Sequence, residues 1–595
     1  MSRRCGSNIR SSRVLGLYAE LHCHTNFSFL DGASHPEELV DEAARLGLAG
    51  LAVTDHDGCY GVVRFAEAAR GAGLPTVFGA ELTLGIESPQ EKEKGEKEKG
   101  EADPPGEHLV VLADGPVGYA RLARAISAGQ MAGEKGAPCF RLAGLADAAR
   151  AGVHLRGNRP SPTNDSWFVL TGCRKGAVPR ALMADGPAAA GRALDRLVRA
   201  FGRDRVLVEL WDHGDPLDRH RNDELARLAA QSRVEVVATN NVHYATSRQR
   251  PLANALAAIR ARRSLDELDG WLPAAGFAHL RSAGEQQRRF ARWPGAVERS
   301  VEIAEACAFD LRLAAPNLPD LEVPAGHTDM TWLAELTRRG AAVRYPSTHP
   351  QHVEAMAQIA HELEVIEQLD FPGYFLLLVD IVDFCRRSDI YCQGRGSAAN
   401  SAVCYALGVT KADAVALGLL FERFLSLERD GPPDIDLDIE HVRREEVIQY
   451  VYAKYGRDRA AQVANVITYR PRSAMREMAK VAGLSPGQAD ALTRQVDRYS
   501  RDAQAFPAKT PDMPALVLDL AQQVLDYPRH LGIHSGGMVM ADRPLVEFCP
   551  IEWARMENRS VLQWDKDDCA AAGLVKFDLL GLGMLTMLHL AVDLI

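Results

Sequence analysis

The sequence lacks several features that would indicate a secreted or membrane-bound protein. Its eleven cysteines form no C-x-x-C pair, which argues against a zinc ribbon or a disulfide scaffold and favours a reducing compartment. No apolar run is long enough to span a bilayer, and no secretory core follows the basic opening "MSRRCGSNIRSSR". We therefore expect a soluble, cytoplasmic protein without a membrane partner.

An excess of positive charge is also missing. The net charge is −10, so binding to nucleic acid would need local basic patches or bridging metal ions. The hydrophobic content of 47% and charged content of 25% are ordinary for a globular chain. A length of 595 residues predicts roughly three to five domains of mixed α/β class.

Short apolar runs alternate with alanine-rich helical segments over residues 14–250, for example "LAGLAVTDHD", "VVRFAEAARGAG" and "PTVFGAEL". This βα alternation predicts a first domain built from strands and covering helices. The charged repeat "EKEKGEKEKGE" (91–101) interrupts it and is typical of a solvated loop insertion.

The composition changes after this first domain. Residues 251–385 are helical and arginine-rich, 386–466 carry glycine-rich turns and an acidic strand, 467–530 are polar and helical, and 531–595 return to strand-like runs. The final apolar helical pattern stops without a polar cap, which predicts that the chain is a fragment of a longer protein.

Candidate metal ligands collect at the strand ends of the first domain. A lone histidine is more often a core or surface residue, but functional groups in such barrels gather at the carboxyl ends of the strands. Imidazole, carboxylate and thiolate suit zinc or manganese. The candidates are His22, His24, Asp31, His56, Glu81, Cys173, Asn241 and His243 at or after strand ends, and His108, which opens its strand.

The motifs "HCHTNFSFLDG", "TDHDG", "GAEL" and "TNNVH" resemble the PHP family of phosphoesterases. The resemblance implies a distorted seven-stranded barrel with a trinuclear metal centre that hydrolyses phosphate esters, as a phosphatase or a 3′-5′ exonuclease. Where the family commonly has aspartate, this chain has Asn241, whose neutral amide binds metal more weakly. The alternative is a barrel kept as a rigid platform.

The stretch "GPPDIDLDIE" (431–440) sets Asp434, Asp436 and Asp438 on one face of a predicted strand. Alternate residues lie roughly 6.6 Å apart, and two unit charges at that distance repel by about 2.5 kcal/mol at an effective dielectric of 20. A divalent cation such as Mg²⁺ would offset this repulsion. An exposed edge strand whose acids face water is the other interpretation.

Two further motifs favour the cation. In "CQGRGSAANS", Gly394, Arg395, Gly396 and Ser397 precede a helical run and could meet phosphate oxygens, although such a turn is also common in ordinary loops. In "AGLVKFDLLGL", the acid Asp578 lies in an apolar run and needs a partner. Lys576 shares its strand face.

With "HLGIHSGGMVM" and "LQWDKDDCAAAGLVKFDLLGL", these motifs resemble, in order, the catalytic core of bacterial C-family DNA polymerases. The resemblance implies a nucleotidyltransferase-like palm over 386–466 and 531–595, a helical thumb over 467–530, the start of the fingers at the end of the chain, and Mg²⁺-dependent addition of deoxynucleotides to a primer-template. It implies catalytic roles for Asp436, Asp438 and Asp578, a supporting role for Asp434, and incoming-nucleotide contacts for Arg395, Gly396, Ser397 and Lys576.

Arg470, Arg472 and Arg476 in "ITYRPRSAMREMAKVAG" could track the DNA backbone, although such a run is usually a solvated face. Details such as "TNNVHYATS" look closer to the error-prone branch, which implies translesion synthesis with a sliding clamp and accessory mutagenesis proteins. Three hypotheses stay open here: a DNA polymerase, a PHP metal-dependent phosphoesterase or exonuclease, and an inactive amino-terminal fragment.

Overall fold

A computed structural model describes the chain except for a set of short segments. These are residues 1–15, 86–105, 154–166, 269–271, 274, 315–317, 320, 426–434, 498–501 and 507–513. The expected loop at 91–101 and Asp434 therefore lie outside the described residues. Contacts divide the chain into two compact units: the first comprises Met1–Ala314, Val466–Gly532 and Val546–Arg555, and the second comprises Ala315–Asn465, Ile533–Leu545 and Met556–Ile595.

The first unit contains a curled seven-stranded sheet whose strands follow their order in the chain. They are β1 (Ala19–Glu20), β2 (Gly50–Val53), β3 (Thr76–Leu84), β4 (Glu107–Ala113), β5 (Trp167–Leu170), β6 (Val206–Leu210) and β7 (Glu235–Ala238). A parallel bridge between Cys23 and Val242 joins the two edges of the sheet. The distorted barrel expected from the sequence is confirmed.

Only β4 runs against its neighbours among these strands. It pairs antiparallel with β3 and β5, whereas the other pairs are parallel. The start of β4 therefore lies at the edge of the sheet where the other strands end. This reversal brings His108 to the same edge as the ligands that follow the parallel strands.

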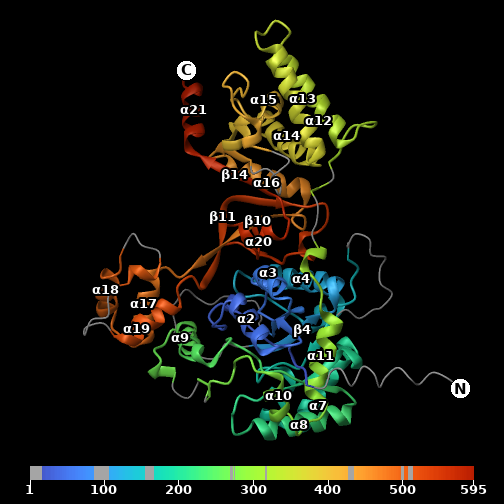
Figure 1. Ribbon diagram of the computed structural model, residues 1–595, viewed down its shortest axis with the longest axis vertical. Helices are drawn as coiled ribbons and strands as arrows, with labels where there is room; N and C mark the ends of the chain where they lie inside the picture. The colour runs from blue at the N-terminus through green and yellow to red at the C-terminus, as the bar shows by residue number, and fades with distance from the viewer. Residues whose placement is uncertain are drawn as a thin grey trace, which may run out of the picture. The chain divides into compact units, whose positions relative to one another are not determined.

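Helices cover the outside of the barrel (Figure 1). They are α2 (Pro36–Leu46), α3 (Val62–Ala72), α4 (Gly115–Ala132), α5 (Leu142–Ala148), α6 (Ala177–Asp185), α7 (Pro187–Phe201), α8 (Asp218–Ser232), α9 (Arg250–Ala261), α10 (Ala283–Arg289) and α11 (Ala296–Cys307). Helix α2 illustrates their local signals. Pro36 opens it, the Glu38 carboxylate accepts the His35 N–H at 2.8 Å, and Gly47 ends it with φ of 67°.

The polar helical region from residue 471 packs on α9. Helices α17 (Pro471–Val481), α18 (Pro486–Arg494) and α19 (Ala515–Gln523) form one apolar core with it, which includes Leu256, Met475 and Met478. The buried Tyr527 hydroxyl donates to the Ala33 carbonyl at 3.1 Å. This helical element is therefore attached to the loop that carries the first barrel ligands.

A second attachment within the first unit is the short strand β12 (Ile551–Trp553), which lies against α4. The Ile551 N–H donates to Ser127 Oγ at 3.0 Å, and Trp553 Nε1 donates to the Met131 carbonyl at 2.9 Å. Arg124 on α4 pairs with the buried Glu547. A segment more than four hundred residues along the chain is thus part of the barrel's outer wall.

The second unit contains a mixed sheet, and several of its helices pack on the apolar face of that sheet. Its helices are α12 (Asp329–Arg344), α13 (His352–Gln368), α14 (Pro372–Arg387), α15 (Ala402–Leu407), α16 (Arg444–Tyr455), α20 (Lys566–Ala571) and α21 (Gly583–Asp593). Its strands lie in the order β13 (Ser560–Leu562), β10 (Ala460–Thr468), β11 (Pro528–Met540), β14 (Lys576–Leu582), β9 (Asp436–Glu440) and β8 (Cys392–Arg395).

The apolar face of this sheet forms the core of the second unit. Leu437 and Ile439 from β9 and Phe577 from β14 are buried with residues of α14. The Tyr374 ring of α14 stacks on Phe577 with 4.7 Å between centroids, and its hydroxyl accepts the Ile435 N–H at 3.0 Å. Alternation along each strand directs the intervening aspartates to the other face.

The α/β multidomain class is confirmed. Residues 251–314, which the sequence placed in a helical connection, fall within the first unit, where α11 packs on the barrel strands. In the part of the chain that the structure describes, no helix is both long and apolar enough to cross a membrane.

Candidate functional site

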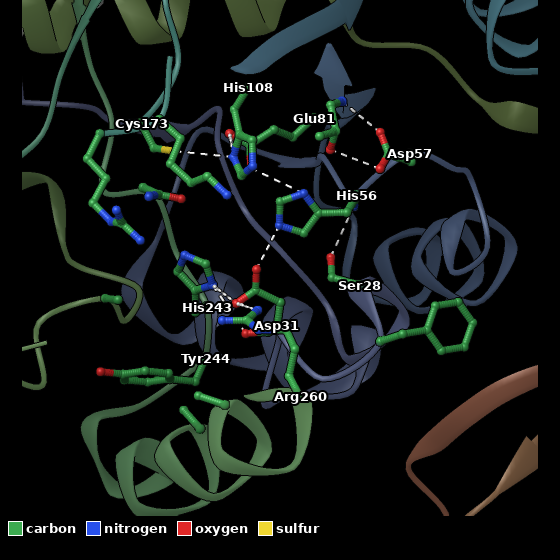
Figure 2. Close-up of a pocket in the computed structure, with 18 of the residues that line it drawn as sticks. Ser28, Asp31, His56, Asp57, Glu81, His108, Cys173, His243, Tyr244 and Arg260 are labelled. Atoms are coloured by element: carbon green, nitrogen blue, oxygen red, sulfur yellow. Dashed lines mark hydrogen bonds and ion pairs between the residues drawn. The ribbon is translucent and has the colours of Figure 1, made fainter. Parts of the chain in front are cut away.

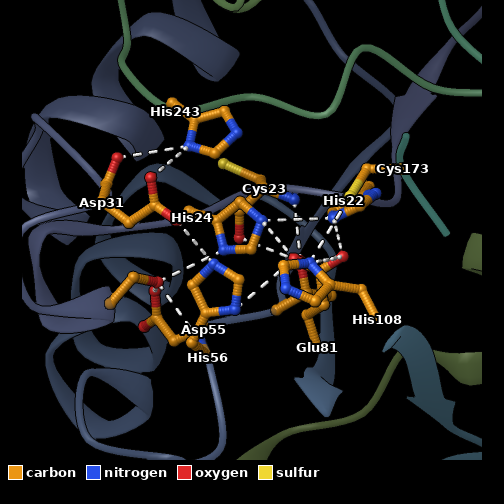
Figure 3. A network of polar contacts seen from close by, with 12 residues as sticks. His22, Cys23, His24, Asp31, Asp55, His56, Glu81, His108, Cys173 and His243 are labelled. Carbon is orange, nitrogen blue, oxygen red and sulfur yellow. Dashed lines mark hydrogen bonds and ion pairs between the residues drawn. The ribbon is translucent and has the colours of Figure 1, made fainter. Parts of the chain in front are cut away.

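Glu81 at the end of the barrel sheet lies at the centre of a histidine cluster (Figure 3). Its Oε1 lies 3.1 Å from His108 Nδ1 and 3.5 Å from His22 Nε2. Its Oε2 lies 3.3 Å from His24 Nε2 and 3.5 Å from His56 Nδ1. Two groups, His22–His24–Glu81 and His56–Glu81–His108, therefore offer ligand atoms that all lie within 4.8 Å of one another.

This cluster fits divalent cations. Glu81 is 1% exposed, and its Oε1 accepts no hydrogen bond of good geometry from the described residues despite the short distance to His108. Burial by itself would raise the pKa of Glu81, but His108 and His22 hold that pKa well below its usual range. Zn²⁺ and Mn²⁺ bind through imidazole nitrogens and carboxylate oxygens, and this cluster offers both.

Two buried acids that the sequence analysis did not identify hold this cluster and its loop in place through hydrogen bonds. Glu209 Oε1 lies 2.7 Å from His22 Nδ1 and fixes the orientation of that ring. Asp55 accepts from the Thr25 N–H at 2.7 Å and from Ser28 Oγ at 2.7 Å, which shapes the loop after β1. The signal for Glu209 was present, because an acid inside the apolar run "RVLVELWDH" needs a buried partner.

Asp31 forms a third corner of the cluster (Figure 2). Its Oδ2 lies 2.8 Å from His56 Nε2, and its Oδ1 lies 3.6 Å from His243 Nδ1. Arg260 from α9 places Nη1 2.8 Å from the same Oδ1. Burial would raise the pKa of Asp31, but Arg260 and the two histidines hold it well below its usual range, while burial lowers the pKa of His243 to about 3.

Cys173 and Asn241 complete the predicted set. Cys173 Sγ lies 3.4 Å from His108 Nδ1, and burial raises the pKa of this thiol well above its usual value. Asn241 is 8% exposed, adopts φ of 42°, and its Oδ1 has no hydrogen-bond partner among the described residues. The structure thus brings all nine predicted metal-binding residues to one end of the barrel.

The cluster opens into a cavity of about 1250 Å³ within the first unit. Asp31, His56, Glu81, His108, Cys173, Asn241 and His243 all line it. Its wall also carries basic side chains from the barrel loops and from later segments of the chain: Lys135, Arg174, Lys175, Arg250, Arg529 and Arg555. Asp57, Asp215, Asp218 and Glu552 line it as well, so the wall carries charges of both signs.

The three predicted catalytic acids of the second unit come from adjacent strands. In the parallel pair of β9 and β14, Asp578 is the direct partner of Asp436, and Leu580 is the partner of Asp438. Neighbouring strands are about 4.8 Å apart, so the acids form one cluster on the polar face of the sheet. Asp438 and Asp578 are 4% and 6% exposed.

Arg395, at the end of β8, spans the two aspartates of β9. Its Nη2 lies 3.2 Å from Asp436 Oδ2, and its Nε lies 3.1 Å from Asp438 Oδ2. Burial raises the pKa of Asp438, and Arg395 partly opposes that rise. The guanidinium therefore offsets part of the repulsion that the sequence pattern creates.

Lys576 and His534 flank Asp578. Lys576 Nζ lies 2.5 Å from Asp578 Oδ2, and His534 Nδ1 lies 3.6 Å from Oδ1. That Oδ1 accepts no hydrogen bond within the described parts of the chain. A buried carboxylate oxygen left unsatisfied beside two further carboxylates fits Mg²⁺, which binds through carboxylates and substrate phosphates.

The glycine-serine turn follows Arg395 directly. Gly396 adopts φ of 64°, a left-handed conformation that glycine takes without strain, and a Cβ there would meet open space. Gly396 and Ser397 begin a short 3₁₀ helix, Gly396–Asn400, which precedes α15. The turn thus lies beside the acids, as the sequence motif predicts.

The predicted DNA-binding arginines lie at the start and on the exposed side of α17. Arg470 caps the helix and pairs with Asp526 at 3.1 Å, and Arg476 lies 3.6 Å from Asp490. Arg472 is exposed, and no ion pair to it is found within the described residues. Two of the three charges are thus partly neutralised by acids of the same helical element.

Comparisons with known proteins match both parts of the chain. Residues 20–213 match the PHP domain family, and residues 331–581 match the bacterial DNA polymerase III alpha NTPase domain family. The chain is 58% identical over 591 residues to an error-prone DNA polymerase of Mycolicibacterium paratuberculosis, covering 98% of this chain and 51% of that protein. It is 55% identical over 613 residues to one of Nocardia farcinica, covering 97% and 52%.

A solved amidohydrolase structure from Chromobacterium violaceum is also similar, with 20% identity, a TM-score of 0.22, and coverage of 38% of this chain and 88% of that one. The class defined by the fold and the matched domains is a PHP barrel joined to a polymerase α-type domain. The chain belongs to the bacterial C-family DNA polymerases, within their error-prone branch. It spans about half the length of the curated relatives it matches.

Proposed function

We propose that the chain carries the catalytic centre of a DNA-directed DNA polymerase that works in error-prone translesion synthesis. The observation that carries the proposal is the direct pairing of Asp578 on β14 with Asp436 on β9, although the two residues lie far apart in the sequence. The error-prone role rests on the names of the relatives. Primer-template DNA and deoxynucleoside triphosphates are the substrates proposed, with a sliding clamp and accessory mutagenesis proteins as partners in the cytoplasm.

Asp436, Asp438 and Asp578 would hold two Mg²⁺ ions. Such a pair stabilises the attacking and leaving oxygens of phosphoryl transfer when it is bound. Arg395 and Lys576, which now neutralise these acids, would turn toward the triphosphate when metal ions take over that charge. Gly396 and Ser397 would let the backbone approach the phosphates closely.

Primer extension with the purified chain tests this proposal, in parallel with a chain lengthened to the size of the relatives. Asp436→Ala and Asp578→Ala should abolish synthesis, whereas His22→Ala in the barrel should not. Retained synthesis in the aspartate variants would refute the assignment. Mg²⁺-dependent binding of a fluorescent deoxynucleotide provides a second measurement that does not require the lengthened chain.

A second candidate function is metal-dependent phosphoesterase or 3′-5′ exonuclease activity in the barrel. It is favoured by the ligand groups that share Glu81 and by the basic residues around the cavity. Zn²⁺ or Mn²⁺ would be held by the histidines and would activate a water molecule. Loss of phosphodiester hydrolysis in His22→Ala or His24→Ala, with synthesis retained, would support it.

A further inference from the structure

Arg260 enters the ligand cluster from outside the barrel strands. It is a residue of α9, near the end of that helix, and its Nη1 lies 2.8 Å from Asp31 Oδ1. Figure 2 shows its side chain directed at Asp31 beside His243. Its Nε–H is buried and donates to no partner within the described residues, while the side chain as a whole is 29% exposed.

The corner around Asp31 differs in charge from the rest of the cluster. Both groups of suitably spaced ligand atoms contain Glu81, and neither contains Asp31 or His243. Asp31 supplies the carboxylate of this corner, Asn241 supplies only a neutral amide, and Arg260 places a positive charge 2.8 Å from Asp31. Arg260 therefore already offsets the charge of the carboxylate that a metal ion would need there.

A divalent cation at this corner would meet one carboxylate, already held by a guanidinium, and a neutral amide. The Asn241 Oδ1 atom is buried and has no hydrogen-bond partner within the described residues. This oxygen is thus available to a metal ion, but it lacks the negative charge of a carboxylate. A like charge within a few ångströms disfavours cation binding strongly at low effective dielectric. The Arg260 guanidinium and the Asn241 amide both lower the affinity of this corner for a divalent cation, although they come from separate elements of the chain.

We infer that the guanidinium of Arg260 takes the place of a third divalent cation, so that the barrel binds two metal ions, at the ligands that share Glu81. With Asn241 and Arg260 in place, the centre would hold two metal ions and one internal cation. The inference concerns the barrel alone. It does not depend on DNA synthesis by the second unit.

Metal stoichiometry tests the inference directly. The chain is freed of metal, saturated with Mn²⁺ or Zn²⁺, passed through a desalting column and analysed by plasma mass spectrometry. The wild-type protein should retain about two ions per chain. The double variant Asn241→Asp with Arg260→Ala should retain about three, because it restores a carboxylate and removes the competing cation.

Asn241→Asp suits its position because aspartate, like asparagine, tolerates the left-handed φ of 42°. Arg263→Ala is the matched control, since it removes an arginine just after α9 that does not line the cavity, and it should leave the count at two. Circular dichroism melting checks that each variant is folded.

Three ions bound to the folded wild-type chain would overturn the inference. An unchanged count in the folded double variant would do so as well, and so would a wild-type count below two. Titration of Mn²⁺ by electron paramagnetic resonance gives an independent count, and neither method measures catalysis. Failure here is therefore distinguishable from failure of the polymerase proposal, which primer extension tests.

Discussion

Asp578 lies directly opposite Asp436 across the parallel strands β14 and β9. Neutralising either residue should remove a carboxylate that would hold metal at the proposed centre. We expect Asp436→Asn and Asp578→Asn to lower the rate of primer extension by at least about 100-fold. Asp383→Asn is the control and should retain the wild-type rate, because this acid of α14 pairs with Arg386 on its own helix.

Arg395 should set the pH dependence of Mg²⁺ binding. Burial raises the pKa of Asp438, and Arg395 opposes the rise. In Arg395→Gln the pKa of Asp438 should rise further, so the carboxylate becomes protonated at a higher pH as the solution is acidified.

As the solution is acidified, the Mg²⁺ affinity of Arg395→Gln should therefore begin to fall at a higher pH than that of the wild type. Isothermal titration with Mg²⁺ at several pH values measures this. Arg395→Lys keeps the charge and should resemble the wild type. Parallel pH profiles for wild type and Arg395→Gln would contradict the role assigned to this ion pair.

Glu209 should control metal affinity without touching the metal. It holds His22 through a 2.7 Å contact to the ring nitrogen remote from Glu81. Glu209→Gln keeps the shape but removes the charge that makes the imidazole a strong ligand. We expect metal affinity to fall about 10- to 100-fold, measured by competition with a chelating dye. An affinity equal to that of the wild type would show that His22 does not bind the ion.

Arg472 should contribute more to DNA binding than Arg470. Arg470 is engaged by Asp526, whereas Arg472 is exposed. Arg472→Ala should weaken DNA binding and reduce the slope of log affinity against log salt by about 1. Fluorescence anisotropy with a labelled duplex measures both quantities. A larger effect of Arg470→Ala would mean that DNA displaces Asp526.

Tyr527 tests the attachment of the helical element to the barrel. Its hydroxyl donates to the buried carbonyl of Ala33. Tyr527→Phe should lower the free energy of unfolding of the first unit by about 1 to 2 kcal/mol, since a buried acceptor loses its donor. Urea denaturation followed by fluorescence measures the change. No loss of stability would indicate that water reaches this carbonyl.

Local pattern was sufficient to predict the acids and most barrel ligands. The period of two in "DIDLDIE" predicted that Asp436 and Asp438 share a face, and the structure agrees. Helix α16 (Arg444–Tyr455) ends where Gly456 follows it with φ of 85°, a conformation that glycine takes easily. These features depend on residues close together in the chain.

Features that depend on distant residues were beyond sequence reasoning. His108 opens its strand, and only the antiparallel direction of β4 explains why it reaches the other ligands. Arg260 lies in an ordinary amphipathic helix, and nothing in its local pattern indicates that it meets Asp31. The pairing of Arg395 with two acids likewise required the register of β8 on β9.

The stacking of Tyr374 on Phe577 has a consequence for inhibition. One aromatic side chain of α14 contacts β14 through its ring and the residue before β9 through its hydroxyl. A small molecule that displaced this ring would remove a contact to each strand. The register of β14 on β9, and with it the alignment of the carboxylates, would then be disturbed. The aspartate cluster therefore depends on a contact at the apolar face of the sheet, opposite the face that carries the carboxylates.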